Sequence, residues 1–112
     1  MFNVFVYGTL KHGHSNSVVM ENSQAEFLGE DETEPKFTMY SNGAFPAVIE
    51  KGETPIKGEV YRVKDMSRLD SLEGYPDFYN RKLIDTKYGP AWIYLMPEIH
   101  SSYWKEVPSG VW

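Results

Sequence analysis

Short runs of alternating or β-branched apolar residues predict a chain rich in strands. The first run, FNVFVY, predicts a strand over Phe2–Tyr7 that ends at Gly8. Turn-forming residues separate the later runs, and one such turn is predicted at KGETP. The later predicted strands cover residues 25–30, 36–40, 46–50, 55–63, 79–86 and 91–96.

Two short helices are predicted among these strands, over residues 17–22 and over Met66–Glu73. Asp65 can cap the second helix with its side chain. Gly74 suits the left-handed position after a helix, and Pro76 prevents its continuation. Strands and helices do not alternate regularly, so a doubly wound sheet is disfavoured. We therefore expect an α+β fold, a small mixed β-barrel of about six or seven strands with two short helices.

The second helix carries a carboxylate, Glu73, close to its apolar face. At about 100° per residue from Met66, Leu69 lies at about 300°, Leu72 at about 240° and Glu73 at about 340°. An apolar environment raises the pKa of a carboxyl group, and a pKa near neutrality suits a general acid and base. The alternative is that Glu73 reaches water at the helix end, because glutamate is seldom buried.

The bend after the first strand is a candidate ligand site. Gly8 lets the backbone approach a ligand closely or adopt a positive φ. The amides of Gly8, Thr9 and Leu10 could donate to an anionic group, and Thr9 adds a hydroxyl. The same sequence also occurs in ordinary turns, so both interpretations remain open.

Composition narrows the class of protein. The 112 residues predict one domain, residues 1–112, and include no cysteine. A net charge of −5 argues against a nucleic-acid or anionic-membrane partner. With no leader-like start and no long apolar run, a cytoplasmic location is expected. The acidic run Glu30, Asp31, Glu32 and Glu34 predicts a solvated loop rather than a cation site.

Two segments in combination resemble the γ-glutamyl cyclotransferase-like superfamily. These are VFVYGTLKHGHSN at residues 4–16 and LDSLEGYPDFYNR at residues 69–81, with KGEVYRV between them. The resemblance runs over nearly the whole chain and is strongest to the γ-glutamylamine cyclotransferases and the plant avirulence-induced proteins. It implies a cavity lined by the Tyr7–Leu10 segment, with Glu73 as the acid/base. Such relatives often read Lys-Arg-Gly where this chain reads Lys11-His12-Gly13, which leaves the substrate preference open.

The activity implied by the resemblance is intramolecular cyclisation. The α-amine of a γ-glutamyl amine or γ-glutamyl amino acid attacks its own γ-carbonyl, which yields 5-oxoproline and a free amine. The partner is then a small molecule, and neither cofactor nor metal is needed. The alternative is a non-catalytic binding module, or an interaction domain that uses Tyr103, Trp104 and Trp112 as anchors. The sequence reveals neither the leaving amine nor the oligomeric state.

Other polar residues have both functional and structural interpretations. Tyr79 and Arg81 share a face of the strand predicted over residues 79–86. Tyr79 could hydrogen-bond Glu73 or substrate, or only pack in the core. Arg81 could pair with a substrate carboxylate, although a surface ion pair is favoured. His12 and His14, even with distant His100, do not make a convincing metal site, because a ligand set needs three or four convergent groups.

Overall fold

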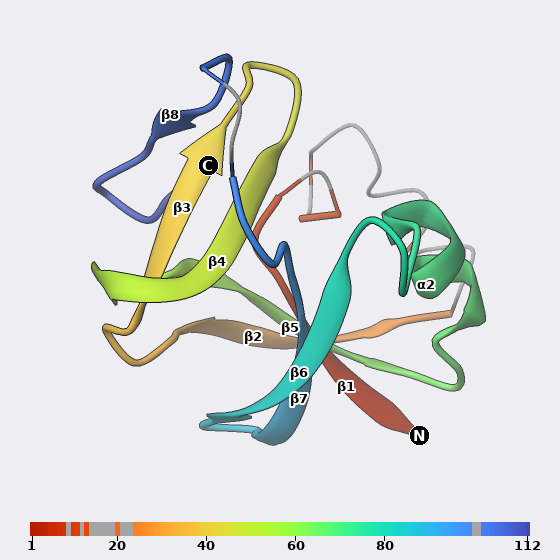
Figure 1. Cartoon of the computed structure of the whole chain (residues 1–112). Coiled ribbons are helices and arrows are strands. Elements are labelled where there is room, and N and C mark those ends of the chain that lie inside the picture. The colour runs from red at the N-terminus through yellow and green to blue at the C-terminus, as the bar shows by residue number, and fades with distance from the viewer. Residues whose placement is uncertain (9, 12, 14–19, 21–23, 100–101) are drawn as a thin grey trace.

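The fold is described here from a computed structural model of residues 1–8, 10–11, 13, 20, 24–99 and 102–112 (Figure 1). These residues form two β-sheets and one helix, α2, which covers Ser67–Glu73. The five-stranded sheet has the order β2-β5-β1-β7-β6, with bounds Glu26–Glu32, Lys57–Val63, Phe2–Val6, Gly89–Leu95 and Asn80–Thr86. The three-stranded sheet has the order β4-β3-β8, with bounds Pro46–Thr54, Phe37–Ser41 and Lys105–Glu106.

The first strand, β1, lies at the centre of the five-stranded sheet. It pairs antiparallel with β5, where Val4 faces Tyr61 in the register, and parallel with β7, where Val4 faces Trp92. The remaining neighbours in both sheets are antiparallel. The mixed sheet predicted from the irregular order of strands and helices is therefore confirmed.

The side chains of β1 and of Tyr7, the residue after it, alternate between two hydrophobic cores, one on each face of the sheet. Val4 and Val6 point into a core that also holds Leu69 of α2. Phe5 and Tyr7 point into a second core that includes Met39 and Val48 of the three-stranded sheet. Successive strand residues face opposite sides, so a strand buried on both faces reads as an unbroken apolar run.

The expectation of a barrel is wrong, because the two sheets do not close on each other. The turn predicted at KGETP is wrong as well, because β4 continues through most of these residues. Gly52 has a φ of +121° there, and a Cβ at this position would lie 2.1 Å from Oγ1 of Thr38. The register of β3 on β4 also shifts between Phe37 and Thr38. A glycine thus lets the strand absorb an irregularity instead of turning.

Three of the four residues in the acidic run lie in a strand rather than a loop, because β2 extends through Glu32 and only Glu34 follows it. These three residues pair with the start of β5, where Glu32 faces Lys57 in the register. The Asp31 carboxylate accepts hydrogen bonds from the backbone amides of Glu32 (2.8 Å) and Lys87 (2.9 Å). Exposed acidic side chains are compatible with a strand at the edge of a sheet.

Helix α2 confirms the predicted helix to within one residue at its start, whereas the helix predicted over residues 17–22 lies outside the described residues. Met66 occupies the N-cap position in place of Asp65. The Asp65 carboxylate still accepts the Ser67 amide at 2.9 Å, and hydrogen bonds from Ser67 lower its pKa. Gly74 ends the helix with φ 65° and ψ 32°.

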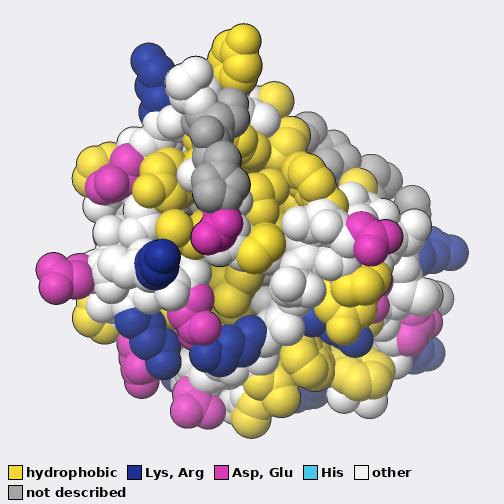
Figure 2. All heavy atoms as spheres, viewed as in Figure 1, with side chains coloured by type: hydrophobic (Ala, Val, Ile, Leu, Met, Phe, Trp, Pro, Cys, Tyr) yellow, Lys and Arg dark blue, Asp and Glu magenta, His cyan; other side chains and the backbone are white. Residues whose placement is uncertain are grey.

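The surface carries mixed charge. Basic and acidic side chains are interspersed on the face in Figure 2, and hydrophobic side chains form a band across its middle. Lys82 and Glu50 make an ion pair across neighbouring sheets. Within the described ranges, no helix is long and apolar enough to cross a membrane.

Candidate active site

A cavity of about 360 Å³ lies between the end of β1, the start of β4 and the end of α2. The residues that line it are mostly apolar or aromatic, with one carboxylate among them. They are Phe5, Val6, Tyr7, Gly8, Leu10, Ala44, Phe45, Pro46, Leu72, Glu73, Phe78, Tyr79 and Tyr94. An apolar cavity with a few convergent polar groups is the usual form of a small-molecule site.

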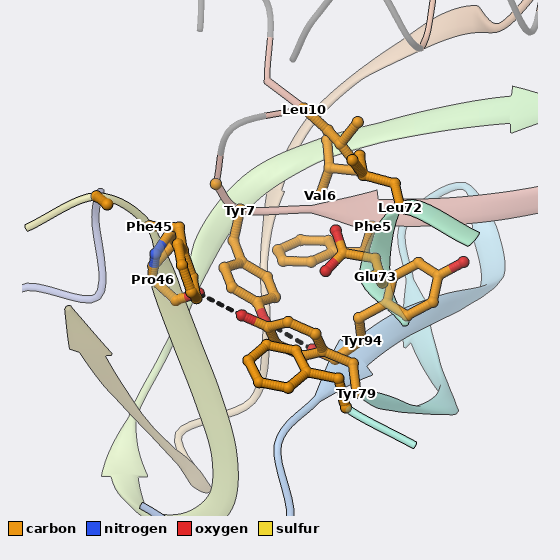
Figure 3. A pocket seen from close by; sticks show the side chains of 13 residues that line it. Phe5, Val6, Tyr7, Leu10, Phe45, Pro46, Leu72, Glu73, Tyr79 and Tyr94 are labelled. Carbon is orange, nitrogen blue, oxygen red and sulfur yellow. Dashed lines mark hydrogen bonds between the residues drawn. The ribbon is translucent and has the colours of Figure 1, made fainter. Parts of the chain in front are cut away.

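Glu73, the last residue of α2, points into this cavity beside Phe5 (Figure 3). Leu69, one turn earlier, is fully buried and fixes the helix on the sheet. The chain leaves the helix through Gly74, and the Tyr79 amide returns to donate to the Glu73 carbonyl at 3.3 Å. Burial raises the pKa of the Glu73 carboxyl from 4.5 to about 7. The raised pKa agrees with the sequence prediction.

Leu72 departs from the predicted apolar stripe. The helical pattern placed it with Met66 and Leu69 as buried, but its side chain is 42% exposed. It borders the cavity instead of the core. The helix ends one residue later, at Glu73.

Three buried tyrosines surround the cavity, and each hydroxyl hydrogen has an acceptor. Tyr7 donates to the Tyr94 carbonyl at 2.7 Å, and Tyr79 donates to the Pro46 carbonyl at 2.9 Å (Figure 3). Tyr94 donates to the Asp70 carboxylate at 2.7 Å. Burial, with smaller contributions from neighbouring acidic groups, raises the pKa of all three hydroxyls. They therefore remain neutral at ordinary pH, with oxygen lone pairs available to accept a hydrogen bond.

The predicted bend after β1 also borders the cavity. Gly8 and the buried side chain of Leu10 line it, whereas Thr9 lies outside the described residues. A Cβ at Gly8 would lie 2.7 Å from Cγ of Pro46. Close approach between the bend and β4, rather than a positive φ, is thus the reason for a glycine here.

Arg81 is tied to the helix rather than to the cavity. Its Nη1 atom lies 3.0 Å from Oδ2 of Asp70 and donates to Oδ1 of the same carboxylate at 3.1 Å. The Cζ atom of the guanidinium lies over the ring of Tyr75, 4.6 Å from its centroid, and over the ring of Trp92, 4.7 Å from its centroid. The ion pair between Arg81 and Asp70 joins β6 to the turn of α2 that carries Glu73. The sequence prediction of a surface ion pair named no partner for Arg81 and missed the partial burial of the pair.

The aromatic tail mostly packs on its own fold. Trp104 contacts Phe45 edge-on at 5.5 Å, and Nε1 of Trp112 donates to Oγ of Ser41 at 3.2 Å. Tyr103 is exposed. This packing argues against an interaction domain anchored by both tryptophans. His12, His14 and His100 lie outside the described residues.

Known proteins resemble this chain over almost its full length. Residues 4–112 match the family described as gamma-glutamyl cyclotransferase, AIG2-like. A Vibrio cholerae protein provisionally named gamma-glutamylcyclotransferase is 43% identical over 111 residues, which cover 97% of this chain and 93% of that protein. The gamma-glutamylcyclotransferase family protein YtfP of Escherichia coli K12 is 37% identical over 111 residues, covering 97% and 94% of the two chains.

Solved structures agree with the sequence comparisons. The solution structure of ytfP from Escherichia coli superposes with a TM-score of 0.78 at 32% identity, covering 99% of this chain and 96% of that one. The crystal structure of an AIG2-like protein from Mus musculus gives 0.79 at 26% identity, with coverages of 92% and 82%. This chain therefore belongs to the gamma-glutamyl cyclotransferase, AIG2-like family.

Proposed function

We propose that the protein cyclises the γ-glutamyl group of a γ-glutamyl amine or γ-glutamyl amino acid, releasing 5-oxoproline and an amine. Glu73 is the proposed general acid and base. The observation that carries the proposal is a carboxyl group whose pKa is raised to about 7, facing a cavity of substrate size. The family match and the named relatives supply the reaction class.

The chemistry requires proton transfer in both directions. The substrate α-ammonium must lose a proton before its nitrogen can attack the γ-carbonyl carbon. The ring C–N bond then forms and the amide C–N bond breaks. Two protons leave the α-nitrogen and two reach the departing nitrogen, so the amine leaves as an ammonium ion. A carboxyl group that titrates near neutrality can accept and return protons at comparable cost, and Glu73 ends the cycle unchanged.

Orientation supplies much of the remaining acceleration. Nucleophile and electrophile belong to one molecule, so the cavity has only to hold the γ-glutamyl chain in its bent form. Well-oriented intramolecular reactions reach effective molarities of about 10⁵–10⁸ M. The buried rings of Tyr7 and Tyr79 give the cavity rigid walls, and their hydroxyl oxygens can accept hydrogen bonds from the α-ammonium.

The backbone around Gly8 is the proposed site for negative charge. Amides of Gly8, Thr9 and Leu10 would either hold the substrate α-carboxylate or stabilise the oxyanion that develops on the γ-carbonyl. Both roles are compatible with a bend at the cavity wall, and the proposed substrate-binding set remains Tyr7, Gly8, Thr9, Leu10 and Tyr79.

The test is direct detection of product. The purified protein is incubated with γ-glutamyl amides and γ-glutamyl amino acids, and 5-oxoproline is measured by mass spectrometry against a no-enzyme control. Enzyme-dependent 5-oxoproline supports cyclisation. If these compounds bind without turnover, the protein is a metabolite-binding module instead.

A further inference from the structure

A run of aromatic side chains leads from the cavity to the protein surface. The Tyr79 and Phe78 ring centroids lie 5.1 Å apart, those of Phe78 and Phe45 lie 6.4 Å apart, and those of Phe45 and Trp104 lie 5.5 Å apart. We call Phe45, Phe78 and Trp104 the aromatic ledge. Tyr79 is buried at the cavity wall, so the ring contacts are continuous from the interior outward.

Apolar surface remains exposed at the cavity edge. Phe78 is 50% exposed and Leu72 is 42% exposed, although both line the cavity. Leu72 directly precedes Glu73, and the Phe78 amide donates to the Gly74 carbonyl at 2.7 Å. Both side chains therefore border the same cavity as the carboxylate that would protonate the leaving nitrogen. Exposed apolar groups next to a cavity are typical of a ligand contact surface.

The charges that line the cavity restrict which charged groups the leaving part of the substrate can carry. Among the lining residues that the structure describes, Glu73 is the one charged side chain, and no lysine or arginine is present. A carboxylate on the leaving group would approach Glu73 without a cationic partner from these residues. Like charges brought together without compensation oppose binding.

We propose that the aromatic ledge binds the substituent on the leaving nitrogen, and that the preferred substrate is a γ-glutamyl amide of an apolar, aromatic amine rather than of an amino acid. This inference rests on the proposed cyclisation and names the substrate class for the same cavity. An aryl group on the ledge would cover Phe78 and Leu72 and stack on an existing array of rings. The leaving amine would carry no charged group other than its ammonium.

Four substrates form a matched test. The γ-glutamyl amides of ethylamine and phenethylamine differ by one phenyl group, and γ-glutamyl-alanine and γ-glutamyl-phenylalanine add an α-carboxylate to each. We expect kcat/KM for the phenethylamide to exceed that for the ethylamide by about tenfold. This is the lower end of the range for an apolar contact, because the Phe78 ring is 50% exposed. We expect each α-carboxylate to lower kcat/KM by about tenfold.

Two variants test whether Phe78 is the source of the preference for the phenethylamide. In Phe78→Ala, the ratio of phenethylamide to ethylamide turnover should fall to about one, because the half-exposed ring supplies the contact. Phe27→Ala is the matched control, since Phe27 is a 54% exposed phenylalanine on β2 that contacts the Tyr61 ring at 5.4 Å, away from the cavity. Its four rates should follow those of the wild type. Circular dichroism and thermal unfolding check that both variants fold.

Binding measured on a variant without turnover separates the proposed aromatic ledge from the proposed cyclisation. Isothermal titration of folded Glu73→Gln should give about tenfold tighter binding of the phenethylamide than of the ethylamide. If no substrate is cyclised but this binding difference remains, the ledge is supported and the cyclisation fails. Cyclisation of all four at similar rates, or better turnover of the amino-acid conjugates, would overturn the ledge and leave cyclisation intact. Loss of both turnover and selective binding would overturn both.

Discussion

Replacing Glu73 by glutamine should make the protein more stable at neutral and alkaline pH. The Glu73 carboxyl has a pKa of 4.5 in its ordinary state and about 7 in the fold, because burial disfavours its charge. At 1.36 kcal/mol per pH unit, that difference corresponds to about 3 kcal/mol. Glutamine has nearly the same shape and no charge to desolvate.

The sign of the effect follows from proton binding. Below pH 4.5 the carboxyl is protonated in both the folded and unfolded states, and Glu73 contributes no penalty. Between pH 4.5 and about 7 the unfolded chain releases a proton that the folded protein retains, so the free energy of unfolding falls as pH rises. Above about pH 7 the folded carboxyl is ionised as well, and the full loss has accumulated.

Urea unfolding of the wild type and Glu73→Gln at pH 4.5 and pH 8 measures this difference. Contributions from all other titrating groups cancel when the two proteins are compared at the same pH. Glu73→Gln should exceed the wild type by about 3 kcal/mol at pH 8 and differ little at pH 4.5. Glu106→Gln, which changes an exposed carboxylate on β8, is the control. A stability difference that is equal at both pH values would refute the burial argument.

Three further predictions concern the same cavity. The kcat/KM for cyclisation should rise as Glu73 ionises and level off above about pH 7, and a flat profile between pH 5 and 8 would contradict its role as base. Arg81→Ala should lower the free energy of unfolding by about 2 kcal/mol, because the partly buried Asp70 carboxylate loses its cationic partner and keeps only the Tyr94 hydroxyl; an unchanged urea midpoint would contradict this. Gly8→Ala should cost about 1–3 kcal/mol, because its methyl group would lie 2.7 Å from Cγ of Pro46; unchanged thermal stability would argue against that contact.

Local signals in the sequence identified the parts of the fold that depend on neighbouring residues. The start of β1 and the end of α2 are examples, because an apolar run and a glycine followed by proline act over a few residues. The position of Glu73 beside the apolar stripe follows from the same short-range geometry. The roles assigned to Thr9 and to the other cavity residues stay predictions.

The features that the sequence did not reveal depend on long-range pairing. β4 continues through KGETP because β3 pairs with it on both sides of an irregularity, and no short window contains that partner. The join between Arg81 and Asp70 is similar, since it forms only after β6 returns beside the helix. The failure to close a barrel likewise reflects how two separate sheets pack, not a property of one segment.

The most direct test of the central claim compares 5-oxoproline formation by the wild type and Glu73→Gln from γ-glutamyl-phenethylamide at pH 7.5. General acid–base catalysis by one side chain contributes about 10²–10⁴-fold, so the variant, folded by circular dichroism and still able to bind the amide, should lose at least that lower factor in kcat. A folded variant that releases 5-oxoproline within about threefold of the wild-type rate, well short of that lower factor, would contradict the claim that Glu73 carries the proton.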